Sequence, residues 1–178
     1  MRKIVLCLAV GLLASAFVGC GGSPSNNNPT AVPAAVEGSL EEAVPVLIPD
    51  PERAVEVIYQ TIENRRVDRV SDNQLNEVFG LSSFMVTNAV AYVSDVTGGG
   101  LCDIAIIRPA PGMTEHVREA LNQYMISRAD SFRNQDILNA YYIASNAVVF
   151  SRGDYVVMLM LPDNDSAREI INLYLPAS

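Results

Sequence analysis

The chain has 178 residues, 49% of them hydrophobic, and a formal net charge of −8 at pH 7. Phosphate backbones repel a protein this acidic, so we expect no nucleic-acid partner, and we expect membrane contact to come only from an attached lipid. Solubility outside the cell is a sufficient reason for the charge.

The first residues have the layout of an export signal. Arg2 and Lys3 form a cationic tip, residues 4–18 are uncharged and largely apolar, and Gly19 precedes Cys20. A membrane span needs about 20 apolar residues, and this run stops short without a cationic stop signal. We therefore predict a cleaved signal peptide over residues 1–19.

The segment Ala16-Phe17-Val18-Gly19-Cys20 resembles the lipobox of bacterial lipoproteins, with Phe17 in place of the usual leucine. The resemblance implies that the Cys20 thiol receives a lipid and holds the protein on the extracytoplasmic face of the cell membrane. Cys7 would leave with the signal, so Cys102 would be the one free thiol. We expect Cys102 to be a buried strand residue.

The next segment has the composition of a flexible linker. Residues 21–35 are rich in Gly, Ser, Pro and Asn and carry no charge, which predicts a disordered tether of about 20 to 25 Å. Pro45 and Pro49 limit any helix in the following stretch to a turn or two. We assign residues 20–49 to the lipidated cysteine and linker, and residues 50–178 to a globular domain.

Two helices are predicted at the start of this domain. Asp50 can cap the first, Pro51 suits its first position, and apolar residues recur at helical spacing until about Asn64. A shorter helix is predicted over residues 72–79, where Gly80 is a suitable terminator.

Two pairs of antiparallel strands are predicted from runs of β-branched and aromatic residues. The first pair covers residues 85–93 and 102–108, with Gly98-Gly99-Gly100 between them. The second pair covers residues 147–151 and 155–161 and is the clearest hairpin in the chain.

Three further helices are predicted: a long one from Thr114 to Phe132, a short one within residues 134–144, and a closing one near the C-terminus. The expected caps and inward positions of these helices are Thr114, Val117, Leu121, Tyr124, Ile137, Tyr141, Asp163 or Asp165, Ala167 and Ile171.

This order predicts a single α+β domain with a mainly antiparallel four-stranded sheet, made of two hairpin-like strand pairs packed with helices. The last two strands are apolar on both faces. Either helices cover both sides of the sheet, or one side meets a partner.

Several short motifs follow one another in the domain: Phe79-Gly80-Leu81, Asp103-Ile104-Ala105-Ile106-Ile107, Ser131-Phe132, Asn146-Ala147-Val148-Val149, Gly153-Asp154-Tyr155-Val156-Val157 and Ala167. In this order, over roughly residues 75–175, the chain resembles a family of small lipoproteins from Gram-positive bacteria that is known only as a domain of unknown function. The resemblance implies a compact lipidated α/β domain and supplies no functional residue other than Cys20.

His116 is the only histidine, so a conventional Ser-His-Asp triad would have to use it. A lone imidazole near a helix start is usually a surface residue, and we predict no catalytic or metal-binding role and no cofactor. Gly98-Gly99-Gly100 could offer amides to an anion, but phosphate loops need a following helix or a lysine. Because a strand is predicted to follow, we interpret the glycines as a hairpin connection.

Two acidic motifs have a simpler structural interpretation. Asp163-Asn164-Asp165 is similar to the start of a calcium loop, but Ala167 and Arg168 stand where further ligands and a glycine are required, so helix capping is preferred. Arg152-Gly153-Asp154 spells the tripeptide that integrins recognise. Gly-Asp also suits a two-residue hairpin turn, and we interpret the motif as that turn.

Two functional hypotheses remain. The favoured one is a non-catalytic interaction or structural module at the cell envelope, with a protein partner or a homodimer, because the strands hold more apolar surface than a small monomer needs. The alternative is a small-ligand binder or a carboxylate-dependent hydrolase of envelope material that uses Asp95, Asp103 and Glu115, with Arg108 nearby. Paired acids must face each other across about 5 to 10 Å, which spacing in the sequence does not determine.

Overall fold

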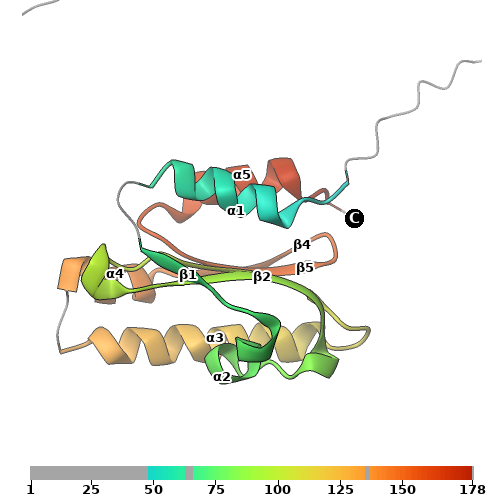
Figure 1. The fold of residues 1–178 in the computed structure, drawn as a ribbon, viewed down its shortest axis with the longest axis horizontal. Helices are drawn as coiled ribbons and strands as arrows, with labels where there is room; N and C mark the ends of the chain where they lie inside the picture. Colours follow the sequence, from blue (N-terminus) through green and yellow to red (C-terminus); the bar gives the residue numbers. More distant parts are fainter. Residues whose placement is uncertain (1–47, 63–65, 135–136, 178) are drawn as a thin grey trace, which may run out of the picture. The chain divides into compact units, whose positions relative to one another are not determined.

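The computed structural model describes residues 48–62, 66–134 and 137–177. The predictions of a signal peptide, a lipidated Cys20 and a tether therefore lie outside the described residues. The described part of the chain forms three layers, with helices on both faces of one antiparallel sheet (Figure 1). The α+β class is confirmed.

The sheet has five strands, whereas four were predicted. They run in the order β1-β2-β3-β5-β4, and every neighbouring pair is antiparallel. The strand missing from the prediction is β1, which has three residues, Val-Asp-Arg, and is too short to give an alternating pattern. The strands are β1 (Val67–Arg69), β2 (Val86–Ser94), β3 (Asp103–Pro109), β4 (Val148–Arg152) and β5 (Tyr155–Met160).

Two helices, α1 and α5, cover one face of the sheet, and the long helix α3 covers the other together with α2 (Figure 1). The short helix α4 packs against the C-terminal half of α3. The helices are α1 (Pro51–Gln60), α2 (Leu75–Phe79), α3 (Thr114–Phe132), α4 (Ala140–Ser145) and α5 (Asn164–Tyr174), and the 3-10 turns are η1 (Asp72–Gln74), η2 (Ser83–Met85), η3 (Val96–Gly98) and η4 (Ile137–Asn139).

Most of the predicted helix ends are confirmed. Asp50 accepts a hydrogen bond from the Arg53 amide at 2.9 Å, and Asp163 accepts one from the Ser166 amide at 3.0 Å. Gly80 ends α2 with a φ of +71°, a backbone conformation that glycine adopts without strain. The prediction for α3 was wrong in one detail, because Thr114 is its first helical residue and the preceding residue, Met113, makes no side-chain cap.

The short helix near residue 140 presents a different face from the one predicted. Ile137 and Tyr141 were expected to point inward, but they are 43% and 37% exposed, and Ala140, Ile143 and Ala144 are buried instead. The reason is that Leu138 and Asn139, just before α4, both have a positive φ. A left-handed step interrupts the helix, so a periodicity counted across it assigns the wrong face.

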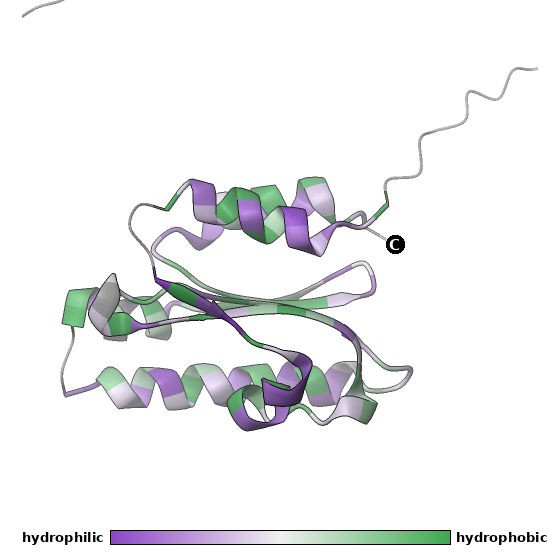
Figure 2. Ribbon diagram, viewed as in Figure 1, coloured by the Kyte–Doolittle hydropathy of each residue, from purple (hydrophilic) through white to green (hydrophobic). Residues whose placement is uncertain are grey.

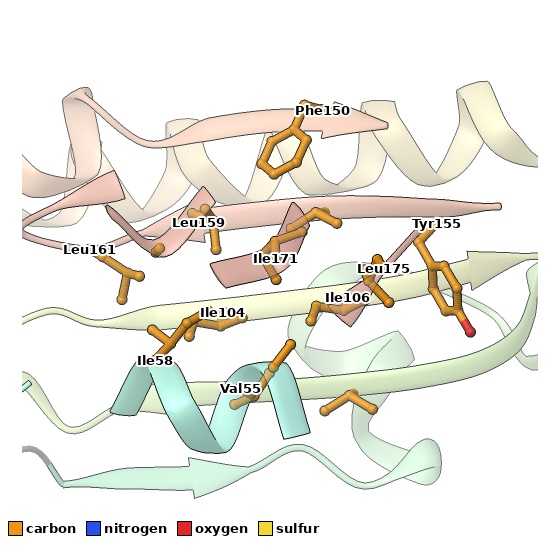
Figure 3. Packing of buried hydrophobic residues seen from close by; sticks show 14 of the residues in the cluster. Val55, Ile58, Ile104, Ile106, Phe150, Tyr155, Leu159, Leu161, Ile171 and Leu175 are labelled. Atoms are coloured by element: carbon orange, nitrogen blue, oxygen red, sulfur yellow. The ribbon is translucent and has the colours of Figure 1, made fainter. Parts of the chain in front are cut away.

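The chain's own helices bury both faces of the central strands. Every residue of β5 and the first five residues of β3 are buried, and hydrophobic residues colour much of the central sheet in Figure 2. On one face, side chains from α1, α5 and the sheet, including Val55, Ile106 and Ile171, pack together (Figure 3). The apolar strands therefore need no partner to cover them. Cys102, as expected, is buried.

Candidate functional site

A buried carboxylate lies where β2 ends and β3 begins. Asp103 is 0% exposed. Its Oδ1 accepts hydrogen bonds from the Ser94 amide at 2.7 Å and the Ser94 hydroxyl at 2.5 Å. Its Oδ2 accepts from the Tyr124 hydroxyl at 2.7 Å and from Arg128 Nε at 3.1 Å. We call these four residues the Asp103 cluster.

The cluster joins the sheet to α3. Tyr124 and Arg128 are one helical turn apart, so both side chains reach the same end of β3. Arg128 also donates from Nη2 to the Ser94 carbonyl at 2.9 Å, and its guanidinium lies 5.3 Å from the Phe132 ring centre. Four donors compensate the buried charge, which burial alone would strongly disfavour.

The tyrosine of the cluster is held in its neutral form. Burial, and next the negative charge of Asp103, raise the pKa of Tyr124 well above its usual range, although Arg128 opposes this shift. The Tyr124 hydroxyl therefore remains a donor to the carboxylate. Because the hydrogen bonds engage both carboxylate oxygens, the cluster is arranged to hold β2, β3 and α3 together.

The structure does not bring the predicted carboxylates together. Asp95 lies beyond the end of β2, where it caps η3 by accepting from the Thr97 amide at 3.0 Å. Glu115 lies in the first turn of α3, beyond the opposite end of β3, and approaches Arg118 at 3.5 Å. The strand between Asp103 and Pro109 spans about 20 Å. Arg108, near that far end, pairs with Asp154 of the turn between β4 and β5, at 2.9 Å.

The remaining sequence candidates have ordinary structural surroundings. His116 is exposed on α3, and no group of three metal-ligating side chains occurs among the residues that the structure describes. Gly98 ends a 3-10 turn that leads into β3, and Asp163 caps α5. Gly153 has a φ of +54° in the two-residue turn between β4 and β5, which fits the turn interpretation.

A groove that the sequence did not indicate lies beside α1. Its volume is about 680 Å³, and its walls include Glu52, Glu56, Tyr59 and Gln60 of α1 together with Tyr92 of β2. The Tyr59 hydroxyl donates to the Cys102 carbonyl at 3.0 Å. Tyr92 and Tyr59 meet edge to face with ring centres 5.7 Å apart. Alternation in β2 places Tyr92 on the face that α1 covers, but no sequence rule pairs it with Tyr59.

A second unexpected feature is an exposed apolar surface before and within α4. Eight large hydrophobic side chains are exposed among the described residues, and half of them fall between residues 137 and 142. We call these four, Ile137, Leu138, Tyr141 and Tyr142, the α4 surface. Leu138 is 58% exposed and Tyr142 is 66% exposed. The sequence signal was the apolar run itself, which was attributed to the core.

None of the helices described is both long enough and apolar enough to cross a membrane.

The comparisons with known proteins identify a family and no activity. No curated protein and no solved structure matches the chain. Residues 60–161, which run from the last residue of α1 to just before α5 and are more than half of the chain, match the model of one family. The chain therefore belongs to DUF4358, a family defined by a domain of unknown function.

Proposed function

We propose that this protein is a lipoprotein anchored through Cys20 on the extracytoplasmic face of the cell membrane, and that its folded domain is a non-catalytic interaction module. The support for the anchor is the sequence: a cationic tip, a short apolar run and a lipobox-like ending, followed by an uncharged linker. A protein partner in the cell envelope is the proposed ligand.

The observation that carries the interaction role is the α4 surface. Leu138 combines exposure with a φ of +51°, a conformation that costs a branched residue roughly 1 to 2 kcal/mol. Large exposed apolar side chains that follow closely along the chain favour an interaction site, and local backbone strain clusters at functional sites. A leucine that is both strained and exposed contributes little to folding, so binding is the better explanation.

The position of this surface suits a tethered protein. Residue 48 and the C-terminal residues lie at one end of the domain, where the Asp50 amide donates to the Tyr174 carbonyl at 3.0 Å. The segment that carries α4 lies at the opposite end (Figure 1). A linker that enters beside Asp50 leaves the α4 surface accessible to a partner.

The hydrolase alternative has less support, because Asp95 and Glu115 lie near opposite ends of β3 and Asp103 is engaged by its own cluster. A small-ligand role is favoured by one observation, the groove beside α1.

The anchor is tested by cell fractionation. The native chain is expected in the membrane fraction and labelled by a palmitate analogue. The variant Cys20→Ala is expected to be unlabelled and to leave the membrane fraction. A native chain that fractionates as a soluble, unlabelled protein would refute the anchor.

Partner capture requires photo-reactive crosslinkers, because every basic residue after Lys3 is an arginine and amine-reactive reagents find no lysine.

A further inference from the structure

The groove beside α1 exists because two helices cannot cover five strands. On this face, α1 and α5 pack over the sheet, and Val67 of β1 and Tyr92 of β2 are only partly buried against them. The exposed side of α1 forms one wall and Tyr92 of β2 forms part of the floor. The volume of about 680 Å³ lies in the usual range of small-molecule sites.

The aromatic part of the groove is preorganised. The Tyr59 hydroxyl is fixed by the Cys102 carbonyl, and its ring supports Tyr92 edge to face. Rings that are already held lose little conformational entropy when a ligand arrives. An aromatic face is electron-rich: the Arg69 guanidinium lies over the Tyr92 ring, 5.8 Å from its centre, and the C–H groups of a ligand that has an apolar side would be attracted to such a face when the exposed arginine moves aside.

The polar part of the groove offers hydrogen bonds with little free charge. Arg53 pairs with Glu56 at 2.5 Å, and Arg69 of β1 pairs with Glu52. Gln60 adds an amide whose Nε2 lies 3.4 Å from Glu56. Asp50, the third acid of the lining, accepts from the Arg53 amide, so each carboxylate already has a partner and a highly charged ligand would have to displace one. The groove offers carboxylate, guanidinium and amide groups that can bond to neutral hydroxyls.

A second, separate hollow lies beside the Glu52–Arg69 pair and shares Glu52 with the groove. This hollow of about 290 Å³ is lined by these two side chains and by Asn88, which lies two residues before Val90 and four before Tyr92 along β2. Residues at this spacing point to the same face of a strand. The hollow is also lined by Leu75 and Val86, which pack on the opposite face of the sheet, so only its Glu52 and Asn88 side adjoins the groove.

We propose that this groove binds a neutral oligosaccharide. A sugar ring has C–H faces that suit Tyr92 and Tyr59, and a rim of hydroxyls that suits the paired glutamates and Gln60. The proposal does not depend on the α4 surface, which lies on other elements, so either can fail without the other.

The test is calorimetric titration of the full chain in detergent with three uncharged tetrasaccharides, cellotetraose, N-acetylated chitotetraose and mannotetraose, and with tetralysine as a cationic probe. Saturable binding of at least one tetrasaccharide is expected. Tyr92→Leu, which keeps an apolar side chain at the site, and the exposed substitution Gln60→Ala should each weaken that binding, the first by about tenfold or more.

The matched control is Tyr142→Leu, which removes an exposed tyrosine from the α4 surface and should leave sugar binding unchanged. Thermal unfolding of each variant separates loss of binding from loss of fold. The proposal is overturned if none of the tetrasaccharides binds, if folded Tyr92→Leu and Gln60→Ala both bind as tightly as the native chain, or if tetralysine alone binds.

Discussion

Asp103 shows how a buried charge constrains its surroundings. Each carboxylate oxygen has its own donors, Ser94 on one side and Tyr124 with Arg128 on the other. Removing one partner of a buried ion pair leaves the other charge without full compensation, which is far more costly than losing a surface pair.

We therefore expect Arg128→Met to lower the free energy of unfolding by about 3 kcal/mol, because methionine keeps the packing beside Phe132 but not the charge. Arg133→Met is the matched control, since Arg133 forms an exposed pair with Asp130 near the same helix end. The measurement is equilibrium unfolding in urea. If both variants lose the same free energy of unfolding, the buried pair contributes no more to stability than the exposed pair does.

Two partly buried tyrosines predict how stability depends on alkaline pH. Burial is the main cause that raises the pKa of Tyr59 and of Tyr124 far above the usual value. In the unfolded chain a tyrosine ionises near pH 10. Above that pH the unfolded state loses protons that the folded state keeps, so stability is full below about pH 10 and falls as the pH rises further.

Urea unfolding at a series of alkaline pH values measures how steeply the free energy of unfolding falls with pH. Tyr124→Phe is expected to make this fall shallower. Tyr141→Phe is the control, because Tyr141 is partly exposed. The explanation fails if the native chain and Tyr124→Phe lose stability in parallel as the pH rises.

At the scale of elements, the helices and the four longer strands could be predicted from the sequence because their signals are local. Asp50, Asp163 and Gly80 act at helix ends through their own chemistry, and runs of β-branched and other apolar residues mark β2 to β5. The strand β1 was missed because three residues form no pattern and its stability comes from pairing with β2.

The candidate sites were less accessible to sequence reasoning. Asp103 begins an apolar strand, which indicates that its carboxylate needs a hydrogen-bond donor inside the protein. Arg128 lies one turn after Tyr124 on the inward side of α3. Their meeting nevertheless depends on three segments separated by up to 34 positions in the chain. The groove likewise requires α1 beside β2, a tertiary contact that no local rule supplies.

The left-handed step before α4 predicts an unusual effect of mutation. Asparagine tolerates a positive φ better than leucine does, so Leu138→Asn should raise the free energy of unfolding by about 0.5 to 1 kcal/mol. Leu173→Asn is the control: Leu173 is also exposed but lies within α5, where asparagine is a poorer helix former than leucine. Thermal unfolding compares the two. A loss of stability in Leu138→Asn would mean that the leucine supports the fold.

At the scale of the whole molecule, the sheet and the surface have separate roles. The apolar faces of the last two strands, β4 and β5, first suggested a partner, but α1 and α5 cover one face of the sheet and α3 covers the other. The case for an interaction module now depends on the α4 surface, which lies at the end of the domain away from residue 48.

The measurement that tests this account most directly is site-specific photo-crosslinking in cells. A photo-reactive phenylalanine analogue replaces Tyr142 on the α4 surface or, as a control, Leu173 on α5, which is similarly exposed. We predict one discrete protein adduct from position 142, either another envelope protein or a second copy of the chain. That adduct should be absent from position 173 and weakened by Leu138→Asn. No adduct at position 142, or the same adducts from both positions, would contradict the interaction role.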